Sequence, residues 1–272
     1  MSKSVDLTTL TGWANLADGT HNITVVAKAT GYQDSDPSTA VQVRKGIVIP
    51  AKGDLITIES KQYRVLKTNG SVAEVLAMYT ASSSQKFDAS SPYTNVYADN
   101  SLDVYLSQTF YNSLSTSIQN AIVAKTFTQD EWSWTSGTSG GTGTAIYQCS
   151  YSSSQYRVGL TNASYGTSIS RKCYVLSVQD VIDYLEVTTS MDMASTTLTS
   201  ANVWLMFWNQ TTSPGNSTTY YPWLRSAISA SSGIVFYVNG RSGYLGDDVV
   251  VSARAVRPAF QIDLSKIEWT KQ

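Results

Sequence analysis

Residues 255–264 read AVRPAFQIDL and residues 223–227 read WLRSA, and these two stretches decide the fold class. Each is a short apolar run bounded by polar, glycine-containing segments, which predicts a strand. Each also holds one arginine, Arg257 in the first and Arg225 in the second. We therefore expect partly buried guanidinium groups that bind carboxylates or carbonyl oxygens. A role in holding the fold together is favoured over contact with a ligand.

Other apolar runs upstream of these two also predict strands, because they are rich in β-branched residues and end at Gly, Pro, Asn or Ser. A turn at Asn69-Gly70 favours a meander of the early strands. The predicted strands cover residues 47–49, 55–58, 62–66, 72–78, 174–176, 204–208 and 234–238.

Two other segments predict helices. Between Leu102 and Ile122 apolar residues recur mostly at four-residue steps, which predicts one or two amphipathic helices over 101–124, broken near 113–117. A shorter helix is predicted over 178–185, with Ser177 as its N-cap and Asp180 in its first turn. Together with the strands, these helices indicate an α+β domain over residues 47–272.

Composition narrows the range of partners. Of 272 residues, 39 are Ser and 31 are Thr, and Lys plus Arg (19) nearly balance Asp plus Glu (20). A net charge of −1 gives no basic surface for nucleic acid. No apolar run approaches the roughly 20 residues of a membrane span, and the first residues lack the pattern of a secretory signal. We expect neither nucleic-acid binding nor membrane insertion.

Few residues are available for catalysis or metal binding. His21 is the sole histidine, so the sequence argues against a catalytic triad and against a metal site built from several histidines. Cys149 and Cys173 lack the spacing of a zinc site, and buried free thiols are the simpler interpretation. The carboxylate pairs Asp180/Asp183 and Asp247-Asp248 are interpreted as solvated surface. We expect no enzyme activity, no metal and no cofactor.

The segment 133–170 is dominated by Ser, Thr, Gly and Tyr, and it includes GTSGGTG at residues 137–143. A phosphate-binding loop would end in Gly-Lys-Ser/Thr and follow a strand, and this segment does neither. We interpret residues 137–143 as a flexible loop.

Residues 1–46 form a separate block. The turn signal Asp18-Gly19 precedes alternating runs at 21–29 (HNITVVAKA) and 40–44 (AVQVR), which predict two strands. The pattern resembles the C-terminal half of a bacterial immunoglobulin-like or fibronectin-like repeat. A whole sandwich needs about 100 residues, so we expect a partial immunoglobulin-like β module here.

Five motifs in order are KGDLITIESKQYRVL (52–66), LSQTFYNSLSTSIQNAIV (106–123), CYVLSVQDVIDYL (173–185), WLRSA and AVRPAFQIDL. Their order resembles a domain family of unassigned function found in surface proteins of gut bacteria and in their phages. The closing portion also resembles the C-type-lectin-like fold of formylglycine-generating enzymes and of variable proteins of diversity-generating retroelements. No Cys follows Cys173, so the oxidation of those enzymes does not carry over.

The resemblance implies a C-type-lectin-like domain in which a twisted antiparallel sheet and two helices support long loops. It further implies a ligand surface on the C-terminal strands, in a phage tail protein on the virion or in an adhesin on the extracellular cell surface. The implied partner is a host or target cell-surface protein or glycan. Phage tail adhesins of this fold are commonly multimeric, so the resemblance also implies a homo-oligomer, in which avidity compensates for weak single-site binding.

The closing segment has an unusual composition. Adenine mutagenesis of an AAC codon by a retroelement never yields Lys, Glu, Gln, Met or Trp, which together make up 41 of the 272 residues. None of them occurs in the 37 residues from Leu224 to Phe260, where the chain average would give about five or six. This gap suggests a variable protein diversified by such an element.

Alternation within this window separates scaffold from display. Phe236, Val238, Leu245 and Val250 are predicted to face inward. The predicted ligand-binding and variable positions are Ile228, Ser231, Ser232, Ile234, Tyr237, Arg241, Tyr244, Gly246, Asp247, Asp248, Val249, Val251, Ser252 and Arg254. Their mixture of Tyr, Arg, Asp and Ser resembles a binding paratope, although an ordinary solvated set of loops has the same composition.

Three hypotheses of function remain open. The leading one is a receptor- or ligand-binding domain of a phage tail or bacterial surface adhesin. The alternatives are a structural connector in a tail or on a surface, and a carbohydrate-processing module on the same fold. The shortage of His and the presence of only five Glu argue against the last of these.

Overall fold

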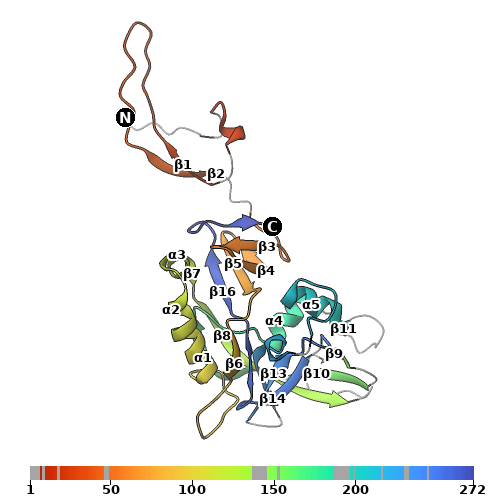
Figure 1. Ribbon diagram of the computed structural model, residues 1–272. Helices are drawn as coiled ribbons and strands as arrows, with labels where there is room; N and C mark the ends of the chain where they lie inside the picture. Colours follow the sequence, from red (N-terminus) through yellow and green to blue (C-terminus); the bar gives the residue numbers. More distant parts are fainter. Residues whose placement is uncertain are drawn as a thin grey trace. The chain divides into compact units, whose positions relative to one another are not determined.

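The computed structural model describes residues 7, 10–16, 19–45, 49–136, 146–151, 154–186, 197–198, 200–215, 217–229, 233–243 and 245–272. The chain divides into two compact units, Met1–Ile49 and Pro50–Gln272 (Figure 1). No helix among these residues is both long enough and apolar enough to cross a membrane.

The first unit contains a short 3-10 helix, η2 (Trp13–Asn15), and one antiparallel strand pair, β1 (Gly19–Ile23) with β2 (Val41–Lys45). The two predicted strands are therefore present, although β1 ends at Ile23 and not at residue 29. Between them, the hydroxyl of Ser38 accepts a hydrogen bond from the Val25 amide (3.0 Å).

The second unit is mixed α+β and consists mostly of strands. Its first sheet has six strands in the order β17-β3-β4-β5-β16-β7, all antiparallel to their neighbours. The strands are β3 (Leu55–Ile58), β4 (Lys61–Asn69), β5 (Val72–Ala77), β7 (Ile122–Val123), β16 (Ala259–Asp263) and β17 (Thr270–Lys271). The meander predicted around Asn69-Gly70 is confirmed, because β4 and β5 pair across that turn.

A second sheet of seven strands has the order β11-β9-β10-β8-β12-β13-β14. Its strands are β8 (Lys125–Ser136), β9 (Ile146–Tyr151), β10 (Ser154–Arg171), β11 (Thr197–Leu198), β12 (Trp223–Ile228), β13 (Ile234–Val238) and β14 (Leu245–Val249). A separate pair joins β6 (Ser82–Lys86) to β15 (Ala253–Val256). The C-terminal third of the chain thus supplies strands to both sheets and to this pair.

Helical segments lie on opposite sides of the six-stranded sheet in Figure 1. On one side are α1 (Ser101–Val104), the π-helical η3 (Tyr105–Phe110), α2 (Tyr111–Ser113) and α3 (Thr116–Ala121); on the other are α4 (Val178–Leu185) and α5 (Ser200–Trp208). A last 3-10 turn, η4 (Thr218–Tyr220), precedes β12. The break predicted near 113–117 is confirmed by the extended Leu114 and by Ser115, which caps α3.

The predicted helix over 178–185 is confirmed. The Ser177 hydroxyl accepts from the amide of Asp180 and the Asp180 carboxylate accepts from the amide of Ser177, which forms a capping box. By contrast, the strand predicted over 204–208 is wrong, because these residues belong to α5. Residues 203–208 (VWLMFW) are all apolar, so the sequence has no periodicity that separates a helix from a strand. The helical spacing is visible only in the burial of Val203, Met206 and Phe207, since Leu205 is exposed.

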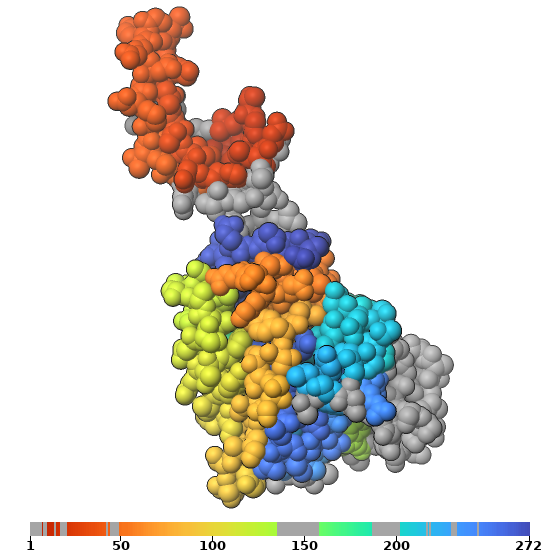
Figure 2. Space-filling model, in the orientation of Figure 1, coloured from red at the N-terminus to blue at the C-terminus, as the bar shows by residue number. Residues whose placement is uncertain are grey.

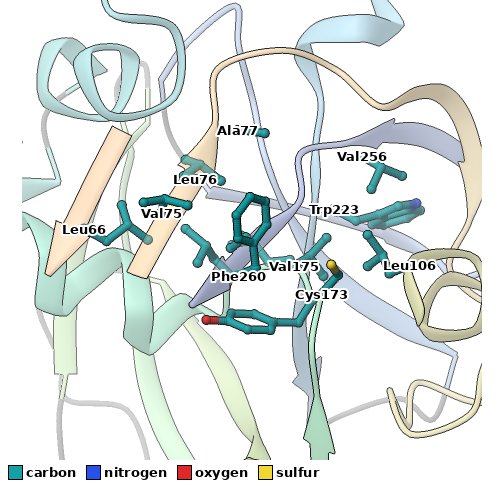
Figure 3. Packing of buried hydrophobic residues seen from close by; sticks show 14 of the residues in the cluster. Leu66, Val75, Leu76, Ala77, Leu106, Cys173, Val175, Trp223, Val256 and Phe260 are labelled. Atoms are coloured by element: carbon teal, nitrogen blue, oxygen red, sulfur yellow. The ribbon is translucent and has the colours of Figure 1, made fainter. Parts of the chain in front are cut away.

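Side chains from both sheets and from η3 meet in one continuous apolar core. Figure 3 shows Phe260 of β16, Trp223 of β12 and Leu106 of η3 within it, and each is at most 1% exposed. Cys173 lies in the same core as a free thiol, as predicted. The predicted strand over 174–176 is reduced to a single bridge between Tyr174 and Ala259. The bridge joins the backbone of Tyr174 to that of Ala259 in β16.

Candidate binding surface

Most of the positions predicted to contact a ligand lie on β12 to β15 and in the turns between these strands. In the space-filling view, the blue C-terminal segment reaches the surface beside the amber segment that contains β6 (Figure 2). Ser231, Ser232 and Tyr244 lie outside the described residues, as do 46–48 and 137–143. The remaining eleven positions can be placed.

Strand register divides the predicted positions between two faces of the sheet. Tyr237 lies opposite Gly246, and Asp248 lies opposite Val235, so Tyr237 and Asp248 share one face. Asp247 lies opposite the buried Phe236, and Val249 lies opposite Ile234, so these residues share the other face. The predicted positions therefore do not share one face of the sheet, because consecutive residues of β14 alternate between faces.

Two positions predicted to be exposed are buried. Ile228 is 5% exposed, because β12 lies between β8 and β13 and all six of its residues are buried. Gly246 is buried because the Tyr237 ring lies across it; a Cβ at Gly246 would be 2.5 Å from Cζ of Tyr237. Both residues belong to the scaffold.

The inward positions are confirmed. Phe236, Val238, Leu245 and Val250 are all at most 1% exposed. The Phe236 ring packs against Trp134 of β8, with ring centroids 5.2 Å apart. These four side chains fix β13 and β14 on the core.

An arginine held by aromatic rings forms the centre of the first face. The guanidinium of Arg254 lies 3.6 Å from the centroid of the Tyr237 ring and 5.5 Å from those of both Tyr221 and Trp223. Its Nε is 2.9 Å from Oδ2 of Asp248. Both charged side chains are mostly buried, at 18% and 25% exposure, so the pair is held more firmly than an exposed ion pair.

We define the aromatic-arginine cluster as Tyr221, Trp223, Tyr237, Asp248 and Arg254. The other predicted positions differ in exposure. Arg241, Asp247 and Val249 are exposed, whereas Ile234, Val251 and Ser252 are half-buried.

The turn and edge beside the cluster are held by local hydrogen bonds. The Asn239 side chain accepts from the amides of Arg241 and Ser242 (3.0 and 3.2 Å), which orders the turn that carries Arg241. The Asp248 carboxylate accepts from the amide of Val249 (2.8 Å) at the edge of the sheet. This bond occupies an edge donor that a further strand would need.

The second face carries the carboxyl group of Asp247, whose pKa is shifted by its surroundings. Burial raises the pKa of the Asp247 carboxyl, while a hydrogen bond from Trp134 lowers it, and the pKa lies above its ordinary value. Asp247 therefore lies at an exposed position with a partly desolvated carboxyl group. Such a group can accept a hydrogen bond from a ligand at a smaller desolvation cost than a fully hydrated carboxylate.

The arginine of β12 belongs to a buried charge network. As predicted, the Arg225 guanidinium binds a carbonyl, that of Val175 (2.6 Å), and a carboxylate, that of Asp180 (2.6 Å). Lys125 joins Asp180 (3.3 Å) to Glu74 (2.6 Å). Burial raises the pKa of Asp180, but the charges of Arg225 and Lys125 outweigh burial and hold this pKa well below its ordinary value.

Asp180 is thus not part of a solvated surface pair, which corrects the interpretation of Asp180/Asp183. Asp183 is exposed and accepts a hydrogen bond from the side-chain Nε2 of Gln179 (2.7 Å). The spacing in sequence placed Asp180 on a short helix, but it carried no sign that Arg225 would approach from another strand.

Arg257 binds carbonyl oxygens, as predicted. Its Nη1 donates to the carbonyls of Phe207 (2.6 Å) and Ala77 (3.3 Å). Burial lowers its pKa to about 10. Arg64 likewise donates to the carbonyl of Leu205 (2.9 Å). Two cations thus bind the C-terminal carbonyls of α5, where the helix dipole favours positive charge.

Among the described residues, no group of three or more His, Cys, Asp or Glu side chains is placed to hold a metal ion.

Comparison with known protein families matches residues 69–264, nearly three quarters of the chain, to a family described as a domain of unknown function, DUF6273. No curated protein and no solved structure gives a significant match.

Proposed function

The chain belongs to the DUF6273 family, and from this premise we propose that its second unit is a receptor- or ligand-binding domain. The binding surface is the edge of the sheet at β14 and the turn before it: the aromatic-arginine cluster lies on one face of this edge strand, Asp247 and Val249 lie on its other face, and Arg241 lies in the turn. The domain acts as a binding protein and carries out no turnover.

The observation that carries this proposal is the rigidity of the cluster next to exposed, chemically varied neighbours. Arg254 is held by three aromatic rings and by Asp248, so its side chain loses little entropy when a ligand binds. Aromatic and arginine anchors surrounded by adaptable residues are typical of binding surfaces. The neighbours offer a cation, a carboxylate and an apolar side chain within one turn and one strand.

The finer assignment follows from the motifs. We propose a C-type-lectin-like domain preceded by a partial immunoglobulin-like module, in a phage tail protein or an adhesin exposed on the virion or on the cell surface. The 37-residue gap in Lys, Glu, Gln, Met and Trp supports diversification by a retroelement. Most of the exposed candidates and the buried scaffold around them fall within this window.

Sequencing the coding locus across the source population tests the proposal without knowledge of the ligand. We expect amino-acid changes at exposed positions such as Arg241, Asp247 and Val249, at adenines of a nearby template repeat. Buried positions such as Phe236 and Gly246 should not change. A window as invariant as the rest of the chain would contradict diversification and would leave a binding domain of fixed specificity or a connector.

A further inference from the structure

A polar groove lies on β4 and β5, and none of the residues that line it belongs to β13, β14 or β15. One hollow of about 250 Å³ lies between these strands and α4, where Leu66, Asp183 and Tyr184 contribute to its walls. A second hollow of about 250 Å³ is lined by Thr68 and Gln261, among others. Lys67 and Glu74 line both hollows, so the two are neighbouring parts of one groove.

Glu74 supplies a buried acceptor to this groove. Its side chain is 3% exposed, and its Oε1 lies 2.6 Å from Lys125 Nζ and accepts from the Tyr174 hydroxyl (2.7 Å). Its Oε2 accepts no hydrogen bond from the described residues. The charged group that lies next to Oε2 is Nζ of Lys67, at 3.1 Å. The Lys67 side chain is 63% exposed, so it can move aside at little cost.

The charges around the groove balance. Cationic and carboxylate side chains in and behind its walls are equal in number: Lys52, Lys67, Lys125 and Arg225 against Glu74, Asp180, Asp183 and Glu186. An anion or a cation entering the groove would lose its hydration without finding a net opposite charge. The groove therefore favours an uncharged ligand.

The walls also offer what an uncharged polyhydroxyl compound needs. Carboxylates accept strong hydrogen bonds from hydroxyl groups, and Asp183 forms no ion pair with any described residue. Lys67 and Gln261 can donate to ring and hydroxyl oxygens. Leu66 and the Tyr184 ring provide an apolar patch for the C–H face of a sugar.

We propose that this groove binds a neutral oligosaccharide, with one sugar unit in each hollow on either side of Lys67. The site is separate from the surface proposed above, and either can fail without the other.

The test measures binding of neutral disaccharides to the full chain by saturation-transfer NMR and by titration up to millimolar concentrations. The probes are lactose, cellobiose, mannobiose and diacetylchitobiose, with sialyllactose and chitobiose as charged comparators. At least one neutral probe should bind more tightly than either charged probe. Asp183→Ala should weaken that binding about tenfold or more, because it removes a charge-assisted hydrogen bond.

Two further variants sharpen the result. Thr68→Val removes a hydroxyl from the second hollow without changing side-chain size. It should weaken binding of the disaccharide but leave binding of the corresponding monosaccharide, measured in the same way, unchanged. Asp99→Asn removes the charge of an exposed carboxylate that does not line the groove and keeps a residue type that tolerates the positive φ of this position, so it should leave sugar binding unchanged. Melting curves of all variants check that each is folded.

Three outcomes would overturn the groove assignment: no neutral probe binds, the charged probes bind equally well, or Asp183→Ala binds as the unaltered chain does. Binding lost in Val249→Asp and retained in Asp183→Ala would place the sugar on the C-terminal strands, which overturns the groove and leaves the proposed function standing.

Discussion

We expect Gly246→Ala to destabilise the second unit and to disorder the aromatic-arginine cluster. A Cβ at this position would lie 2.5 Å from Cζ, 2.6 Å from Oη and 2.9 Å from Cε1 of Tyr237. The Tyr237 ring must then move, and it carries Arg254 at 3.6 Å from its centroid. Overpacking of this kind costs about 1–3 kcal/mol, and for a unit of this size each kcal/mol lowers Tm by roughly 2–4 °C.

Gly233→Ala is the matched control. No atom of the described residues lies within 4 Å of a Cβ built at Gly233, so the effect of this substitution on the free energy of unfolding should stay within about 0.5 kcal/mol. Chemical denaturation measures both variants. In a double-mutant cycle, Tyr237→Ala removes the clashing atoms, so adding Gly246→Ala should cost almost nothing further. Equal stabilities of the two alanine variants, or strictly additive effects in the cycle, would refute the reasoning.

Three further predictions concern buried and titrating groups. Asp180→Asn leaves Arg225 buried beside a neutral group and should lower the free energy of unfolding, measured by urea denaturation, by about 3–5 kcal/mol. Asp183→Asn on the same helix should lower it far less, and similar losses for the two variants would contradict the charge network. Hydrogen bonds from Ser265, above all from its hydroxyl, lower the pKa of Asp263 from 3.8 to about 2. The Asp263 carboxylate therefore contributes its full stabilisation above pH 3.8 and loses it as the pH falls through about 2. Asp263→Asn should flatten the pH dependence of the unfolding free energy between these two pH values, and an unchanged slope would contradict this. Burial raises the pKa of the Cys173 thiol to about 12, so native protein should not be alkylated there by iodoacetamide at pH near 8, as judged by peptide mass, until it is unfolded; rapid native labelling would contradict the buried position.

The parts of the fold that could be predicted from sequence have strong local signals. An arginine inside an apolar run indicates a buried guanidinium group, and both Arg225 and Arg257 are buried. The single strand predicted around Arg257 is wrong, however, because Arg257 and Pro258 separate β15 from β16, which belong to different sheets. The N-cap at Ser177 and the break before α3 likewise depend on neighbouring residues alone. Strand alternation placed Phe236 correctly, because its inward neighbours repeat at every second position.

The parts that could not be predicted depend on contacts distant in sequence. The long pairing of β8 with β10 is rich in Ser, Thr and Gly, and three register shifts interrupt its periodicity. Asp180 has a solvated pattern on its own helix and becomes part of a network only because β8 and β12 bring Lys125 and Arg225 to it. The burial of Gly246 follows from the position of one ring on the adjacent strand.

The central claim is that the second unit binds a target through the surface around β14. The most direct measurement compares binding of three proteins to a glycan array and to cells of the source community: the chain with Asp183→Ala, which removes the contribution of the groove on β4 and β5, and the same chain with Val249→Asp or Val104→Asp added. Both valines are exposed, at 45% and 39%, but Val104 lies on α1. We predict that Val249→Asp loses binding while Val104→Asp retains it. Equal binding by all three proteins, or a chain that binds no target, would contradict the account.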